Sequence, residues 1–104
     1  MSLADFAFPS VSNAPTTPGE YEYWNAFPDG AVVAAGDVYV IAHPSADDFI
    51  TAEADHFHQY LSNGDDGYAL VQGTDSDYTI VDIIGTWEAD PGSGWDVAGV
   101  AQGT

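Results

Sequence analysis

Lysine and arginine are absent from this chain, whereas 17 of its 104 residues are aspartate or glutamate. The formal net charge is therefore −17 with histidine neutral, and no carboxylate can form a salt bridge with a lysine or arginine of the same chain. Nucleic acids are bound by basic side chains that replace the phosphate counterions, and anionic membranes attract the same side chains. We therefore expect neither a nucleic acid nor a membrane as a partner.

Cysteine and long apolar runs are absent as well. The first absence excludes a disulfide framework, a cysteine-based zinc site and a cysteine nucleophile. The second excludes a transmembrane helix, and the N-terminus lacks the basic and then apolar layout of a signal peptide. The 104 residues, 45% of them hydrophobic, suit a single domain over residues 1–104 with a modest core.

The acidic composition is typical of proteins that work in salt. Repulsion among so many carboxylates opposes compactness, but it keeps a protein soluble where salt screens the charges. The composition therefore favours a halophilic or marine source. Stability must then come from burial and backbone hydrogen bonds, with bound cations as a further contribution.

The clearest local pattern is a β-hairpin between residues 63 and 85. An acidic turn and a strand occupy residues 63–71, and a second acidic turn at residues 74–77 leads into a second strand over residues 78–85. Period-2 alternation, frequent β-branched residues and a loop of about five residues favour an antiparallel pair. The expected faces are Ala69 with Val71 and Leu70 with Gln72, then Tyr78, Ile80, Asp82 and Ile84 against Thr79, Val81 and Ile83.

Further strands are expected before this hairpin. Residues 3–8 alternate up to Pro9, residues 10–19 read as an extended loop, and the aromatic residues 21–27 again alternate. Residues 38–42 are apolar on both faces, as expected of a strand in the middle of a packed sheet. The pattern predicts an all-β, mostly antiparallel sandwich.

One short helix is expected near residues 45–54. Ser45 is the predicted N-cap and Asp48 its reciprocal partner, because this spacing forms a capping box. The apolar face of the helix would consist of Phe49, Ile50 and Ala54.

Four stretches carry a resemblance to a known family, in that family's order and spacing across residues 29–96. They are Gly36-Asp37-Val38-Tyr39-Val40-Ile41-Ala42-His43, Leu61-Ser62-Asn63-Gly64-Asp65-Asp66-Gly67-Tyr68-Ala69-Leu70, Val81-Asp82-Ile83-Ile84-Gly85 and Asp90-Pro91-Gly92-Ser93-Gly94-Trp95. The sequence resembles the lamin-tail domain superfamily, in the bacterial form found on secreted and cell-surface proteins. The resemblance implies an immunoglobulin-like β-sandwich that serves as an accessory module, in an extracellular or cell-surface location. It implies no catalytic residues.

The chain departs from the family pattern at both ends. The family usually has a strand before the segment matched by residues 3–8 and another after the segment matched by residues 97–104. The resemblance therefore implies a domain truncated on both sides, with open sheet edges that pair with other chains. We expect a protein partner or self-association at these edges, with a homodimer, including a strand-exchanged one, as the expected assembly.

Acidic turns are the first candidate metal sites. Asn63, Asp65 and Asp66 offer the hard oxygen ligands that Ca²⁺ takes, and residues 74–77 offer a second set at the other end of the same strand. Neither set fits the EF-hand spacing. The alternative is that Asn, Asp and Gly are simply good turn formers. No cofactor is expected unless these turns bind Ca²⁺.

A histidine pair is the second candidate metal site. In an extended chain, His56 and His58 point to one side and can share a transition metal, with Asp55 or His43 completing the site. The alternative is that these residues are ordinary exposed loop residues.

Catalysis is not expected. The sequence contains no Gly-x-Ser-x-Gly elbow, and an oxyanion would meet strongly negative surroundings. Adjacent carboxylates such as Asp65 and Asp66 can do acid–base work on a sugar, but acids in turns are usually solvated.

Aromatic residues allow one more hypothesis. A carbohydrate-stacking surface could be formed by Tyr21, Tyr23, Trp24, Trp87 and Trp95. Burial in the core is the favoured alternative, because a small sandwich needs large side chains. The sequence thus predicts a non-catalytic accessory or interaction module, with a Ca²⁺- or carbohydrate-binding domain as the alternative.

Overall fold

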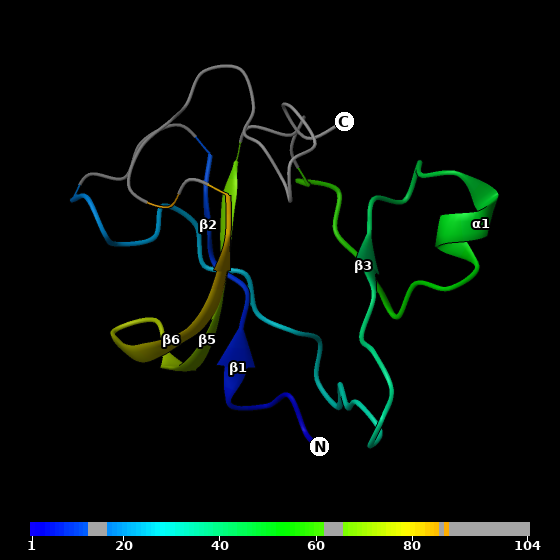
Figure 1. The fold of residues 1–104 in the computed structure, drawn as a ribbon, viewed down its shortest axis with the longest axis horizontal. Helices are drawn as coiled ribbons and strands as arrows, with labels where there is room; N and C mark the ends of the chain where they lie inside the picture. The colour runs from blue at the N-terminus through cyan, green and yellow to red at the C-terminus, as the bar shows by residue number, and fades with distance from the viewer. Residues whose placement is uncertain (13–16, 62–65, 86, 88–104) are drawn as a thin grey trace. The chain divides into compact units, whose positions relative to one another are not determined.

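The computed structural model describes residues 1–12, 17–61, 66–85 and 87, which belong to two compact units. One unit contains Met1–Ala4 and Phe27–Leu61, and the other contains Asp5–Ala26 and Ser62–Thr104. Strands, mostly antiparallel, dominate the described residues, which include one short helix (Figure 1). The predicted all-β class is therefore confirmed.

The second unit is built on the predicted hairpin of β5 (Gly67–Thr74) and β6 (Asp77–Ile84). The predicted loop of about five residues is too long, because Thr74 already pairs with Asp77 and only two residues turn the chain. β5 is the central strand of the four-stranded sheet, since it pairs with β6 on one side and with two short strands on the other.

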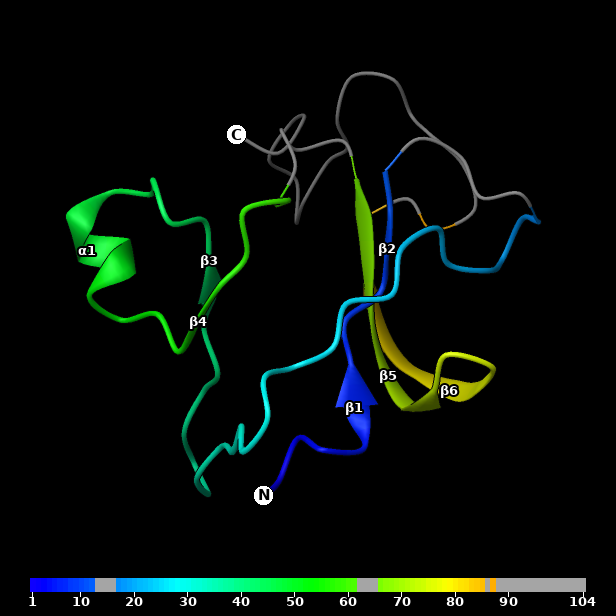
Figure 2. The same cartoon turned by 180° about the vertical axis from the view of Figure 1, so that it is seen from behind.

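Those two short strands are β1 (Phe6–Ala7) and β2 (Ser10–Val11), which lie one after the other along β5 (Figure 2). Pro9 separates them because proline has no N–H to donate to a sheet. The Pro9 carbonyl still accepts a hydrogen bond from the Ala69 amide at 3.0 Å. The prediction of an extended loop over residues 10–19 is therefore wrong for Ser10 and Val11, which form β2.

Residues 22–26 lie along the other side of β1 and β2. Isolated bridges join Ala26 to Ala7 and Tyr23 to Ser10, and the Phe8 amide donates to the Asn25 carbonyl at 2.8 Å. The predicted strand over residues 21–27 is thus reduced to two bridges, because backbone pairing is interrupted opposite Pro9.

Alternation along β5 creates the core of this unit. Ala69 and Val71 are buried on one face, as the sequence predicts, whereas Leu70 and Gln72 are exposed on the other. The buried cluster consists of Ala7, Val11, Ala69, Val71 and Trp87, and the side chains packed around it are Tyr21, Trp24 and Tyr78.

A β-bulge divides β6. Val71 pairs with Ile80 but Leu70 pairs with Asp82, so Val81 is an extra residue on β6. Cross-strand partners share a face, and the partner of the buried Ala69 is therefore Ile83. The prediction that Tyr78, Ile80, Asp82 and Ile84 share one face is wrong, since the bulge moves Asp82 and Ile84 to the opposite face.

The first unit contains a small parallel sheet of β3 (Ile41–Ala42) and β4 (His56–Phe57). Parallel strands need a long crossover, which residues 43–55 provide. The predicted strand over residues 38–42 is shorter than expected and does not lie in the middle of a sheet: β4 is its only partner among the described strands. Val38 is accordingly 71% exposed.

The single helix of the described residues, α1 (Asp48–Thr51), lies within the predicted range but begins later than expected. Asp47, not Ser45, is its N-cap, and the Asp47 carboxylate accepts a hydrogen bond from the Phe49 amide at 3.0 Å. The predicted apolar face is wrong, because α1 buries no residue and Phe49 is 89% exposed.

Candidate functional site

The first acidic turn is only partly described by the structure. Asn63 and Asp65 lie outside the described residues, whereas Asp66 immediately precedes β5 and is 7% exposed. Among the residues that the structure describes, no three His, Asp or Glu side chains cluster as metal ligands would. The Ca²⁺ hypothesis for these three residues stays a prediction.

The second acidic turn closes the hairpin at the opposite end of β5. The Thr74 hydroxyl donates a hydrogen bond to the Asp77 carbonyl at 3.4 Å, and the Tyr21 hydroxyl donates to the Asp75 carbonyl at 2.9 Å. Desolvation, with the negative charge of Asp75 second, raises the pKa of Tyr21. This turn therefore ties residue 21 to the hairpin.

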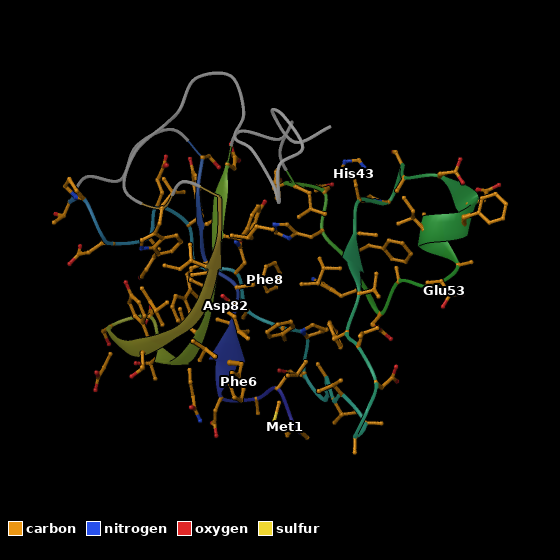
Figure 3. All side chains as sticks on the ribbon, viewed as in Figure 1. Met1, Phe6, Phe8, His43, Glu53 and Asp82 are labelled. Carbon is orange, nitrogen blue, oxygen red and sulfur yellow. The ribbon has the colours of Figure 1, made fainter. Side chains whose placement is uncertain are left out.

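The histidine pair belongs to the first unit. His56 is on β4 and His58 follows it on the same side, with 6.4 Å between the ring centroids. Burial, followed by the proximity of His56, lowers the pKa of His58. The other two proposed ligands accept hydrogen bonds from backbone amides. The Asp55 carboxylate accepts from the Val40 amide at 2.8 Å, and Nδ1 of His43, labelled in Figure 3, accepts from the Ser45 amide at 3.0 Å. The structure thus brings the two histidines together without a third ligand beside them among the described residues.

The aromatic residues mostly serve the core. The rings of Tyr21, Trp24 and Tyr78 lie 5.2–5.7 Å apart and tilt against one another, as aromatic pairs prefer. Trp87 is buried, and its indole N–H donates to the Gly19 carbonyl at 3.1 Å. These partners favour burial over sugar stacking, whereas Tyr23 is exposed. Trp95 lies outside the described residues.

The outer edge of β6 is the most distinctive surface of the second unit. The amides of Gly73 and Ala69 donate to the carbonyls of Asp5 and Pro9, so these β5 residues direct their backbone groups away from β6. In an antiparallel pair, the residues opposite them direct their own backbone groups away from β5. The outward-facing positions on β6 are therefore Tyr78, Ile83 and, by the two-residue period, Ile80.

No other described strand pairs with this edge. The side chains along it are nevertheless apolar and exposed; they are Ile80, Val81, Ile83 and Ile84. A long, apolar edge strand normally invites another chain, and natural proteins guard such edges with charge.

Asp82, labelled in Figure 3, provides that charge on β6. Its Oδ1 accepts a hydrogen bond from the Ile83 amide at 2.9 Å. Because Ile83 faces outward, the Asp82 carboxylate occupies an amide that an incoming strand would otherwise bind. Sequence reasoning missed this arrangement, although isoleucine and valine at both odd and even positions of residues 80–84 indicate a strand with two apolar faces.

Comparisons with protein-family models, curated proteins and solved structures find no match to this chain. The resemblance to lamin-tail domains therefore remains a hypothesis drawn from the sequence. No helix among the described residues is long and apolar enough to cross a membrane.

Proposed function

We propose that the chain is a non-catalytic accessory module of an extracellular or cell-surface protein, and that it binds an extended protein segment along β6. The immunoglobulin-like sandwich of the lamin-tail family is the finer fold that we propose, since an antiparallel sheet with one apolar face supplies one layer of it. A second copy of the chain, giving the expected homodimer, is the alternative occupant of the same edge.

One observation carries this proposal. β6 is 8 residues long, no other described strand pairs with its outer side, and it exposes four apolar side chains. Strand addition to such an edge uses main-chain hydrogen bonds for affinity and alternate side chains for specificity. A binding module needs no more than this surface.

Amide hydrogen exchange tests the proposal on the full chain. In the free protein, the amides of Tyr78 and Ile80 should exchange faster than those of Gly73 and Ala69, because the latter donate hydrogen bonds to the carbonyls of Asp5 and Pro9. A mixture of extended peptides of varied charge should contain members that slow the exchange at Tyr78 and Ile80. If no peptide of any charge slows it, the proposed function is wrong.

Replacing Ile80 by proline provides a specific block. The Ile80 amide faces outward, so Ile80→Pro removes a donor from the edge without removing a β5–β6 hydrogen bond. We expect the variant to retain the hairpin and lose peptide binding. Ile80→Val, which keeps the edge amide and an apolar side chain, should retain binding, and slow exchange at Gly73 and Ala69 in Ile80→Pro checks that the hairpin is still folded.

A second candidate function is cation binding at the acidic turn before β5. Asp66 immediately precedes β5, and carboxylate and amide oxygens such as those of residues 63–66 are the hard ligands that Ca²⁺ takes. We propose Asp66, with Asn63 and Asp65, as ligands of Ca²⁺.

Thermal melts with EDTA, and then with excess Ca²⁺, test this second candidate. In about 1 M NaCl, which screens general attraction of divalent ions, saturation at about 100 times the dissociation constant should stabilise the fold by about 2.7 kcal/mol. Asp66→Asn should abolish the rise in melting temperature, and Asp37→Asn, at an exposed position elsewhere, should retain it. An unchanged melting temperature in the parent chain would remove the Ca²⁺ site.

A further inference from the structure

We propose that the occupant of the β6 edge is an extended segment of a basic protein, with an arginine or lysine side chain placed against Asp82. This inference rests on the proposed function and names the chemistry of the partner. Its basis is the combination of an apolar edge strand with a carboxylate that caps one of the outward amides.

The backbone of β6 presents unequal positions to an incoming strand. Tyr78 and Ile80 face outward with no backbone partner among the described residues. The Ile83 amide also faces outward, but it donates to Asp82 Oδ1 at 2.9 Å. A neutral strand therefore has to displace the Asp82 carboxylate to use the Ile83 amide, whereas a basic side chain can draw that carboxylate into an ion pair.

The charges near this edge have one sign. Asp77 and Asp82 lie on β6, and Asp75 lies in the adjoining turn. Because the chain has no lysine or arginine, a lysine or arginine that pairs with these carboxylates at the interface must come from the partner. A second copy brings another net charge of −17 and no lysine or arginine, so charge complementarity disfavours it and favours a basic partner.

The exposed side chains define the rest of the partner. Ile80 and Ile83 lie on the face that carries Val71 and Ala69, and Ile84 lies on the opposite face with Asp82. A strand that alternates apolar and basic residues can place apolar groups beside the isoleucines on one face and basic groups beside Asp82 on the other. The inferred ligand is thus a basic, amphipathic β-strand.

The test uses the full chain and synthetic peptides of 8 residues, the length of β6. The probe alternates arginine and valine. One control replaces arginine by glutamine, and a second control keeps every arginine but carries N-methyl groups on alternate amides, which leaves the charge and blocks strand pairing. Fluorescence anisotropy gives affinity at about 0.15 M salt, and amide exchange reports the edge.

Two protein variants isolate the role of Asp82. Asp82→Asn removes the charge but leaves an oxygen that can accept from the Ile83 amide. Asp37→Asn is the matched control, since Asp37 Oδ1 accepts from the next amide, that of Val38, at 2.8 Å in the other unit. We expect Asp82→Asn to weaken binding of the arginine peptide by about two- to fivefold, as for an exposed ion pair, and Asp37→Asn to change it little.

The outcomes separate this inference from the proposed function. Slowed exchange at Tyr78 and Ile80 by the arginine peptide, lost on N-methylation and weakened by Asp82→Asn, supports both. If the glutamine peptide binds as tightly as the arginine peptide, or if Asp82→Asn and Asp37→Asn bind the arginine peptide with equal affinity, the inference of a basic partner is wrong. Either result leaves the proposal of strand binding at the edge intact. Equal binding of the N-methylated peptide shows only general charge attraction and overturns the inference. Slow exchange that depends on protein concentration, without peptide, identifies a second copy as the occupant and overturns it as well.

Discussion

A substitution of Gly73 tests the geometry on which the hairpin and its open edge depend. Gly73 has a φ of +130°, a region that residues with a Cβ rarely adopt. A Cβ at this position would collide with the Asp77 carbonyl oxygen and lie 2.8 Å from the Tyr78 Cα. Both groups are backbone, so relief requires a shift of β6 against β5. We expect Gly73→Ala to lower the free energy of unfolding by about 2–4 kcal/mol, from backbone strain and weakened pairing at the turn.

Gly19→Ala in the same unit separates strain from collision. Gly19 has a φ of +91°, but a Cβ there would meet no atom within 4 Å, so only the strain of about 1–2 kcal/mol remains. Urea unfolding followed by tryptophan fluorescence measures both variants, because Trp87 is buried in this unit. If the two variants lose the same free energy of unfolding, the Asp77 carbonyl can shift away from the new Cβ at little cost. An unchanged Gly73→Ala variant would refute the turn geometry itself.

Two further predictions concern the core and the histidine pair. Val71→Ala should lower the free energy of unfolding by about 1.5–3 kcal/mol, because Val71 is 0% exposed, whereas Val81→Ala at 55% exposure should change it by less than about 0.5 kcal/mol in the same urea assay. Burial and His56 lower the pKa of His58, so the folded state favours the neutral ring. As the pH falls below about 6.5, the ordinary histidine pKa, the melting temperature of the parent chain should therefore fall more steeply than that of His58→Gln. Melting temperatures that fall equally with pH in the two proteins would contradict this.

The features that the sequence predicts well are those determined by neighbours along the chain. The alternation of Ala69 and Val71 with Leu70 and Gln72 determines which face of β5 is buried, and the structure confirms it. The acidic turn predicted at residues 74–77 likewise ends β5. Each of these signals lies within a few residues and needs no knowledge of the partner strand.

The features that sequence reasoning missed depend on contacts between distant segments. Residues 80–84 contain apolar side chains at both odd and even positions, so their pattern is compatible with either face, and only pairing with β5 places the bulge at Val81. Ser10 and Val11 follow a proline in a loop-like composition, yet β5 recruits them as β2. Tertiary pairing overrides local preference in both cases.

The helix start shows a different limit. Ser45 and Asp47 are both good N-cap residues, and the sequence places them two positions apart. The structure selects Asp47, whose carboxylate binds the Phe49 amide at 3.0 Å, while the Ser45 amide donates to His43 Nδ1. The sequence alone cannot decide between two N-cap residues of similar strength, because the choice depends on the backbone path before the helix.

The sequence predicts the charge of the candidate site but not its position in the fold. The absence of lysine and arginine already requires that any lysine or arginine at an interface come from a partner. The location of the proposed interface depends on the topology, in which no other described strand pairs with the outer side of β6 and the Ile83 amide faces outward. The bulge then places Asp82 on the face opposite the core, where its carboxylate can cap that amide. In the proposed interaction, the carboxylate that opposes neutral strands and a second copy of this chain is available to a basic strand. Asp82 would thus both protect the edge and select its partner.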